Sequence, residues 1–184
     1  MRKIIAIGGM PGTGKTTLMK KIIESTDDWV VSKPADLLDS IYSNKLDLYI
    51  FGKYAPYYEG DGYAWGTDRL SMAVQPKATE FISNTKSNVL FEGDRLFNQS
   101  FLEHCVSLDA KTHIYVLTCD KDTLKCRYTD RGSEQSEQFI NGRETKYGNL
   151  QTNFLLMMNM ETMPNETPED QYKIYSNILE ALSK

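Results

Sequence analysis

The residues from Gly9 to Thr17 read GMPGTGKTT and have the types and spacing of a phosphate-binding loop. Glycines let the backbone curl tightly enough for successive N–H groups to converge on a polyphosphate, which Cβ atoms would otherwise exclude. At this spacing Lys15 should reach the β and γ phosphates of a nucleotide, and the Thr16 hydroxyl should bind Mg²⁺. We therefore expect ATP with Mg²⁺ to be held by the whole loop, namely Gly9, Met10, Pro11, Gly12, Thr13, Gly14, Lys15, Thr16 and Thr17.

The residues on either side of this loop supply the strand and the helix that the motif requires. An apolar run, Ile4 to Ile7, comes before it, and an amphipathic stretch begins at Leu18. A helix that starts there directs its positive N-terminal dipole at the same anion. A glycine turn without phosphate binding would need Lys-Thr to stand at this offset by chance, so the pattern favours a nucleotide site.

A second polar cluster, FEGDR, ends the apolar residues of another predicted strand, Val89 to Phe91. It places Glu92, Asp94 and Arg95 at the carboxyl edge of a parallel sheet, where ligands of such folds bind. Glu92 or Asp94 could hold Mg²⁺, Asp94 could instead take a proton from a phosphate acceptor, and Glu92 and Arg95 could contact that acceptor. The alternative is that an acid only caps a turn and pairs with Arg95.

Asp36 is the first candidate for the catalytic base, and Asp94 is the second. Asp36 follows a predicted strand, Trp29 to Ser32, at an edge that borders the acceptor side of the phosphate-binding loop in many such folds. The alternative for Asp36 is an acid in the first turn of a predicted helix, Ala35 to Ser43, where its charge favours the helix dipole.

Arg127 and Arg131 stand four residues apart in a polar segment with a helical pattern, so both project from one face. Arg143 follows in a second polar segment. Residues 121–150 are predicted to form a short helical lid, in which Arg127 and Arg131 close on the nucleotide and Arg143 on the acceptor. An arginine delivered to the γ phosphate can raise the rate about 10³- to 10⁵-fold. Because acids are interspersed, the alternative is a solvated helix with surface ion pairs.

Residues 46–67 lose any regular period and are rich in aromatic residues and glycine, which predicts an aromatic loop that contacts the acceptor. Rings on a loop suit stacking on a nucleobase, at about 1 to 3 kcal/mol per base, and Tyr63 and Trp65 are the candidates. Arg69 could hold a phosphate of the acceptor, or it could instead pair with Asp68 or Glu80. The alternative is a flap whose rings pack on one another. Near the C-terminus, Asn165 could contact adenine.

The composition predicts one globular domain over residues 1–184, because 40% of the residues are apolar and 25% are charged. The net charge of −4 gives no general attraction to nucleic acid. The cysteines are odd in number and lack metal or redox spacing, which indicates reduced thiols. No segment approaches the roughly 20 apolar residues of a membrane span. We therefore expect a soluble, cytoplasmic protein.

Alternating strands and helices predict an α/β fold with a parallel sheet that helices cover on both faces. The predicted strands are Lys3–Gly8, Trp29–Ser32, Val89–Phe91, Thr112–Thr118 and Phe154–Met160. The predicted helices are Lys15–Ser25, Ala35–Ser43, Asp68–Ser83, Gln99–His104, Asp120–Asp130, a helical hairpin over Ser133–Leu150, and Pro168–Leu182.

Over essentially its whole length the sequence resembles the small P-loop kinases of the nucleoside and nucleotide kinase superfamily. The resemblance rests on GMPGTGKTT, FEGDR, CRYTDRG and NGRETKYGN. It implies a P-loop NTPase fold with a five-stranded parallel sheet, use of ATP with Mg²⁺, and transfer of the γ phosphate to a hydroxyl or phosphate. The middle departs from familiar members, because it lacks the Asp-Gly-x-Pro-Arg signature of adenylate kinases and has Glu-Gly-Asp-Arg where deoxynucleoside kinases have Glu-Arg-Ser.

The strings GTDRLSMAVQP and QSEQFINGRETKYGN look similar to phage-encoded kinases that phosphorylate 5-hydroxymethyluracil in DNA. This resemblance implies DNA modification in the host cytoplasm and a modified pyrimidine as the acceptor. An acidic protein would then need a local groove of cations, formed by Lys45, Lys53, Arg69, Lys77 and Arg95.

Other acceptors stay open, namely a nucleoside monophosphate, a polynucleotide 5′ end or a small metabolite. A nucleotide-dependent binding module or switch is the alternative of another class. The arginine pair disfavours a switch, because a switch often receives its arginine from the partner.

Overall fold

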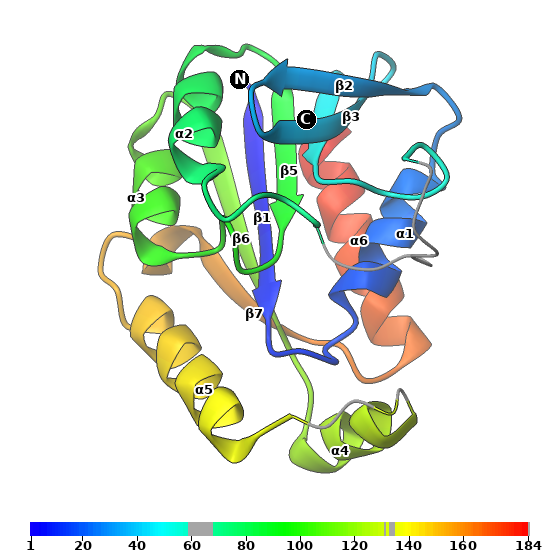
Figure 1. The fold of residues 1–184 in the computed structure, drawn as a ribbon, viewed down its shortest axis with the longest axis vertical. Coiled ribbons are helices and arrows are strands. Elements are labelled where there is room, and N and C mark those ends of the chain that lie inside the picture. The colour runs from blue at the N-terminus through cyan, green and yellow to red at the C-terminus, as the bar shows by residue number, and fades with distance from the viewer. Residues whose placement is uncertain (59–67, 131, 133–134, 184) are drawn as a thin grey trace.

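The computed structural model describes residues 1–58, 68–130, 132 and 135–183, and its centre is a twisted sheet (Figure 1). In the described residues this sheet has seven strands in the order β2-β3-β4-β5-β1-β6-β7. The strands are β1 (Lys3–Gly9), β2 (Trp29–Ala35), β3 (Leu38–Ser43), β4 (Leu48–Phe51), β5 (Asn88–Glu92), β6 (Lys111–Thr118) and β7 (Met160–Pro164). The helices are α1 (Lys15–Ile23), α2 (Gln75–Asn84), α3 (Gln99–Ser107), α4 (Lys121–Asp130), α5 (Glu137–Gln151) and α6 (Pro168–Ser183), with a 3₁₀ turn at Met157–Asn159.

The sheet contains a parallel part and an antiparallel extension. The strands β4, β5, β1, β6 and β7 are parallel neighbours, while β2 and β3 pair antiparallel at the β4 edge. The predicted α/β fold is confirmed, and the predicted five-stranded sheet is extended to seven strands. The sequence prediction missed β3 and β4, and it took β2 for a parallel strand.

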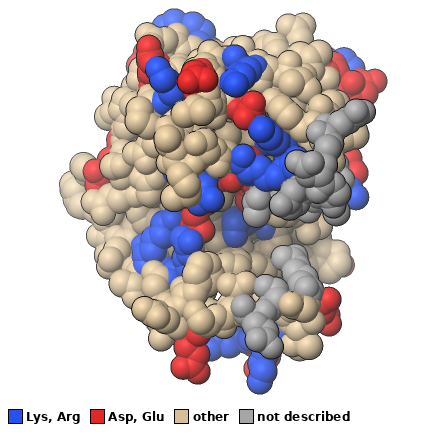
Figure 2. All heavy atoms as spheres, viewed as in Figure 1, with Lys and Arg blue, Asp and Glu red and all other residues tan. Residues whose placement is uncertain are grey.

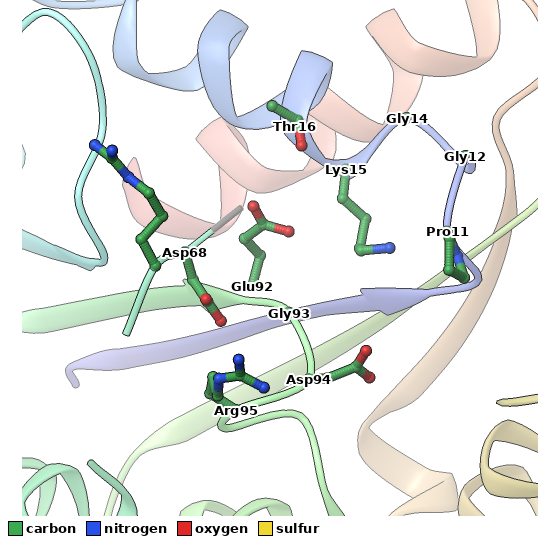
Figure 3. Close-up of a pocket in the computed structure, with 11 residues that line it drawn as sticks. Pro11, Gly12, Gly14, Lys15, Thr16, Asp68, Glu92, Gly93, Asp94 and Arg95 are labelled. Atoms are coloured by element: carbon green, nitrogen blue, oxygen red, sulfur yellow. The ribbon is translucent and has the colours of Figure 1, made fainter. Parts of the chain in front are cut away.

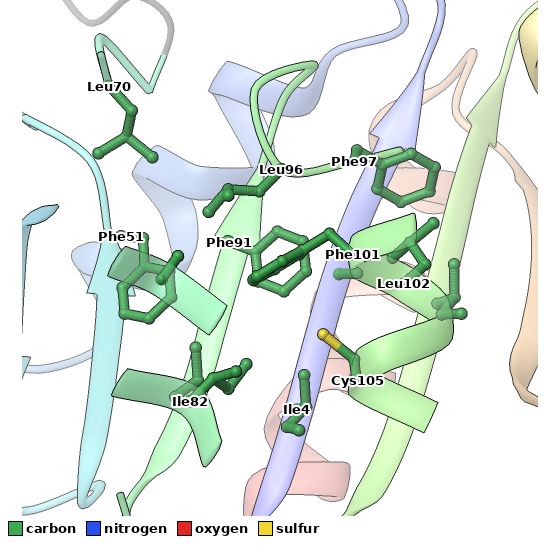
Figure 4. Close-up of a cluster of buried hydrophobic side chains, with 14 of the residues drawn as sticks. Ile4, Phe51, Leu70, Ile82, Phe91, Leu96, Phe97, Phe101, Leu102 and Cys105 are labelled. Atoms are coloured by element: carbon green, nitrogen blue, oxygen red, sulfur yellow. The ribbon is translucent and has the colours of Figure 1, made fainter. Parts of the chain in front are cut away.

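Helices cover both faces of the sheet, with α2 and α3 on one face and α1 and α6 on the other (Figure 1). The central strand β1 is fully buried, so its side chains alternate between the two layers: Ile4 packs with the α2 and α3 layer, and Ile5 with the α1 and α6 layer. In the α2 and α3 layer the rings of Phe91 and Phe101 pack edge to face, with their centroids 5.2 Å apart (Figure 4). Complete burial of such a side chain contributes about 1.5–3 kcal/mol.

The helix predicted over Ala35–Ser43 is wrong, because this segment is the second half of a β-hairpin. The turn between β2 and β3 contains Leu37, whose φ of 62° is left-handed and stops any helix there. Leu38 and Ile41 are then buried by pairing with β2 and β4. Leu38 and Ile41 lie three residues apart but pack into opposite layers, so the apparent helical spacing comes from a strand that is buried on both faces.

Three other predicted bounds are shifted. The strand β4 begins inside the predicted aromatic loop, and the ring of Tyr49 packs against that of Tyr42 at 4.5 Å. The helix predicted from Asp68 begins at Gln75, since Pro76 suits the first turn of a helix. The last strand begins at Met160 and not at Phe154, which is exposed.

The segment predicted as a lid, residues 121–150, contains α4 and α5. No α4 residue is buried, whereas α5 buries Tyr147 and Leu150 against the α2 and α3 layer. The helical hairpin predicted from residue 133 is one helix, α5, in the described part. None of the described helices is both long enough and apolar enough to cross a membrane.

Candidate functional site

The turn between β1 and α1 has the backbone of a phosphate-binding loop. Gly12 and Gly14 have φ values of 80° and 87°, a left-handed region that side chains disfavour. A Cβ atom on Gly14 would lie 2.5 Å from the Nδ2 atom of Asn165. Helix α1 begins at Lys15, so its unpaired N–H groups open toward the loop.

Side chains from three distant segments hold the carbonyl groups of this loop. They come from α4, from α5 and from the segment between β7 and α6. The bonds are Asn165 Nδ2 to Thr13 O (2.6 Å), Tyr128 Oη to Pro11 O (2.8 Å), Tyr147 Oη to Gly9 O (2.9 Å) and Arg127 Nη1 to Gly12 O (2.9 Å). Sequence reasoning singled out neither tyrosine, because both partners lie more than 100 residues away.

Two residues of the loop project into a cavity of about 290 Å³ (Figure 3). Lys15 donates from Nζ to Gly9 O at 2.7 Å and to Met10 O at 3.0 Å, and Thr16 lies one residue further on α1. The cavity is lined by Pro11, Gly12, Gly14, Lys15, Thr16, Asp68, Arg69, Glu92, Gly93, Asp94 and Arg95. The structure therefore brings together the phosphate-binding loop, the FEGDR segment and Arg69, as the sequence predicted.

Glu92 is the most deeply buried acid of the cavity, with an exposed fraction of 2%. Burial raises its pKa to about 7, and the charge of Lys15 opposes this rise. Its Oε1 atom has no hydrogen-bond partner among the described residues. The nearby Tyr54 hydroxyl lowers the pKa of Glu92. Neither Tyr54 Oη nor Glu92 Oε1, however, has a hydrogen bond of normal distance and angle among the described residues. A buried carboxylate oxygen that accepts no hydrogen bond is suited to bind a cation or a hydrogen-bond donor of a ligand.

Asp68 is a second buried acid that lines the cavity, and sequence reasoning considered it only as a partner for Arg69. Its exposed fraction is 6%, and burial raises its pKa while the charge of Arg95 lowers it. The only signal in the sequence was its place beside Arg69. Its burial depends on glycines that lie far away in the sequence.

Asp94 lies at the other end of the FEGDR turn and forms ion pairs with α5. Its Oδ1 atom lies 2.7 Å from Arg143 Nη1 and 2.8 Å from Lys146 Nζ. The predicted acceptor ligand Arg143 is therefore bound to the predicted base Asp94. This contact also docks α5 against the edge of the cavity.

A second cavity, also of about 290 Å³, lies on the opposite side of the loop between α4 and the start of α6. Arg127 forms one wall and donates from Nη2 to Glu166 O at 3.0 Å. The cavity is lined by Gly12, Gly14, Thr17, Arg127, Asn165, Glu166, Thr167, Pro168 and Gln171. Amide, hydroxyl and guanidinium groups around a narrow space are suited to the base of a nucleotide.

The remaining predicted site residues have different outcomes. Asp36 is exposed in the turn between β2 and β3 and does not line either cavity, because three strands separate β2 from β1 in the sheet. Tyr63, Trp65 and Arg131 lie outside the described residues. Asn165 is 2% exposed and holds Thr13, so it supports the loop as well as lining the second cavity.

The described part of the aromatic segment packs inward. Tyr54 has an exposed fraction of 1%, and Tyr58 donates to Ser40 O at 3.0 Å. Tyr57 and Tyr58 pack against the α1 and α6 layer. These rings therefore pack into the α1 and α6 layer, and not on one another as the packed-flap alternative predicted.

Comparisons with known proteins agree with this architecture. A family model described as an AAA domain matches residues 5–148. No curated protein matches the sequence. A sugar kinase from Janibacter sp. HTCC2649 superposes with a TM-score of 0.54 at 10% identity, over 100% of this chain and 95% of that one.

Two further solved structures are similar over nearly their whole length. A gluconokinase from Sinorhizobium meliloti 1021 has a TM-score of 0.48 at 12% identity, with 97% of this chain and 98% of that chain covered. An uncharacterized protein from Eubacterium ventriosum ATCC 27560 has a TM-score of 0.49 at 16% identity, with 100% and 99% covered.

Proposed function

The chain belongs to the AAA domain family, and we propose that it is an ATP-dependent kinase that transfers the γ phosphate to a hydroxyl group. One observation carries this proposal: the phosphate-binding loop opens into a cavity that also holds buried carboxylates. Phosphoryl transfer needs cations around the phosphate and a carboxylate near the acceptor.

The donor half of the site consists of the loop and the second cavity. Backbone N–H groups of the loop and the start of α1 bind the phosphates, and Lys15 neutralises the charge that moves with the γ phosphate. The adenine base fits the second cavity beside Arg127 and Gln171. Arg131 lies outside the described residues, and its role toward the phosphates stays the prediction made from its spacing of four residues from Arg127.

The residues of the first cavity fit Mg²⁺. Thr16 and Glu92 line the same space, and the Oε1 atom of Glu92 is a buried oxygen without a partner among the described residues. No cluster of three His, Cys, Asp or Glu side chains able to hold a metal occurs in the described ranges, so phosphate oxygens must complete the coordination. When bound, Mg²⁺ would neutralise phosphate charge. Asp94 contacts Arg143 and Lys146 and is placed to support this ion only from a distance.

The acceptor half lies on the far side of the same cavity, where Arg69 and Arg95 join Asp68. Carboxylates and arginines together suit an acceptor that carries hydroxyl groups. The printed name of one structural neighbour describes a sugar kinase, and a sugar is a hydroxylated small molecule. We therefore place a small hydroxylated molecule first among the acceptors.

The hydroxymethyl group of 5-hydroxymethyluracil in phage DNA is the specific acceptor that follows from the sequence resemblance, and it remains our second candidate. Three cations expected to form the DNA groove each pair with an acid, which weakens their attraction for a phosphate backbone. These pairs are Lys45 with Asp27, Lys53 with Asp39, and Lys77 with Glu80. Free nucleotides and polynucleotide 5′ ends remain further candidate acceptors and are included in the same experiment.

Transfer of label from γ-labelled ATP to a panel of acceptors tests the proposal. The panel contains sugars and polyols, nucleosides and their monophosphates, 5′-hydroxyl oligonucleotides, and duplex DNA with 5-hydroxymethyluracil. We expect one class to take label, with no transfer by Lys15→Ala and normal transfer by Lys20→Ala, which removes an exposed lysine of the same helix. Steady hydrolysis without any labelled acceptor would instead support a nucleotide-dependent switch.

A further inference from the structure

Asp68 is surrounded by three residues with left-handed backbone. Gly52, Arg69 and Gly93 have φ values of 129°, 48° and 83°. Arg69 directly follows Asp68 and is not a glycine, so its left-handed conformation is strained. Strained backbone of this kind persists only where the surrounding structure fixes it, and it gathers at functional sites.

The two glycines make room for Asp68. A Cβ atom on Gly93 would lie 2.7 Å from Asp68 Oδ2, and one on Gly52 would lie 2.8 Å from Asp68 O. The Asp68 carbonyl accepts a hydrogen bond from Lys53 N at 3.0 Å. The ends of β4 and β5 therefore form a cradle that fixes both the backbone and the carboxylate of Asp68.

The two oxygens of this carboxylate have different surroundings. Oδ1 accepts a hydrogen bond from the Leu70 N–H at 3.3 Å, and Oδ2 is the oxygen beside Gly93. Asp68 lines the cavity together with Lys15 and Glu92, on the side away from the loop (Figure 3). An acceptor hydroxyl between Asp68 and the γ phosphate would therefore meet a carboxylate that is held in place.

The two other acids of the cavity are less suited to accept a proton. Asp94 is bound by Arg143 and Lys146, which occupy one of its oxygens. Glu92 is buried and is the residue that would hold Mg²⁺ in the proposed function. Burial raises the proton affinity of Asp68 above that of an exposed aspartate, and Arg95 keeps it from rising further.

We propose that Asp68 is a catalytic residue of this kinase and takes the proton of the acceptor hydroxyl through Oδ2. The proposal rests on the proposed function. In the transfer step the acceptor oxygen forms a bond to the γ phosphorus and its proton passes to Asp68. The bond between the γ phosphorus and the bridging oxygen breaks, and ADP leaves with that electron pair. Asp36, the base expected from the sequence, plays no part in this step.

The test measures kcat, KM and ADP affinity for Asp68→Asn, Asp36→Asn and the control Asp109→Asn, which changes an exposed acid between α3 and β6. A base contributes about 10²- to 10⁴-fold, so kcat of Asp68→Asn should fall by at least 100-fold. Its affinity for a fluorescent ADP analogue and its thermal midpoint should stay unchanged. The other two variants should match the wild type in all these measurements.

Three results would overturn the proposal: a kcat of Asp68→Asn within threefold of wild type, a matching loss of ADP affinity, or loss of kcat in Asp36→Asn alone. If Asp68→Asn does not fold, Asp68→Glu is measured in its place. This variant keeps the charge but moves the carboxylate, so a tenfold lower kcat with normal ADP affinity supports the proposal and an unchanged kcat overturns it. Failure of the wild type to label any acceptor refutes the proposed function itself, whereas an active wild type with an active Asp68→Asn refutes only the role of Asp68.

Discussion

Replacement of Glu92 by Gln should remove most of the pH dependence that this residue gives to the stability of the fold. Glu92 is buried, and its pKa is raised from 4.5 to about 7 by burial. Gln has the same shape but cannot ionise. The variant therefore isolates the cost of placing a negative charge at this position.

The size of the effect follows from the rise in pKa. Each tenfold change in proton affinity corresponds to about 1.4 kcal/mol, so a rise from 4.5 to about 7 corresponds to about 3 kcal/mol. Below pH 4.5 the carboxyl group is protonated in both the folded and the unfolded chain, and it costs nothing. Between 4.5 and about 7 only the unfolded chain loses the proton, so the free energy of unfolding falls as the pH rises. Above about 7 the full penalty is present.

Urea unfolding of the wild type and of Glu92→Gln at about pH 5 and pH 8 measures this cost. We expect the difference in the free energy of unfolding between the two proteins to change by about 2 to 3 kcal/mol from pH 5 to pH 8, in favour of the variant at pH 8. Other titrating groups, such as His113, are common to both proteins and cancel. The fixed cost of burying an amide cancels as well, because it does not depend on pH.

Lys15 provides an internal check on the same reasoning. Its charge lowers the pKa of Glu92, so Lys15→Met should raise that pKa further and enlarge the loss of stability at pH 8. A difference between wild type and Glu92→Gln that is the same at both pH values would refute the reasoning. It would mean that water or local rearrangement solvates the carboxylate in the folded protein.

Three further predictions follow from contacts of the phosphate-binding loop. Lys15→Ala should abolish phosphoryl transfer while the thermal midpoint stays within a few degrees of wild type, and normal transfer would exclude the loop as the donor site. Tyr147→Phe should lower the free energy of unfolding by only about 1 kcal/mol, because Gly9 O keeps its bond to Lys15, and a loss above 3 kcal/mol in urea unfolding would contradict this. Asn165→Ala should cost about 1–3 kcal/mol and weaken ADP binding at least tenfold, since Thr13 O loses its buried donor; unchanged ADP affinity by titration calorimetry would show that the loop does not need this support.

The sequence predicted the elements whose structure is decided locally. The strand, loop and helix around Gly12 require only a buried apolar run, glycines with left-handed backbone and an amphipathic stretch. The strands β5 and β6 could also be predicted from their apolar runs, because strands buried on both faces need continuous apolar residues. These elements position Lys15 and Glu92, which were both predicted to belong to the site.

The elements that the sequence did not predict depend on partners distant in the chain. The segment from Leu38 to Ile41 fits a helical or an extended pattern, and its pairing with β4 decides between them. The strand β4 in turn lies in a segment whose aromatic composition indicated a loop. Asp36 follows β2, which runs in the same direction as β4, but three strands separate β2 from β1 in the sheet, so Asp36 does not line the cavity.

The net charge of −4 was also a poor guide to the site, because charge in this protein is distributed unevenly. Among the described residues, the first cavity and its edge bring together five cations, Lys15, Arg69, Arg95, Arg143 and Lys146, against three acids, Asp68, Glu92 and Asp94. Lys and Arg side chains accordingly gather across the middle of this face (Figure 2). One of the acids is partly neutral at pH 7, so the cationic excess is larger than the count of side chains. An anionic nucleotide is therefore attracted to a local surplus of positive charge in a protein that is acidic as a whole.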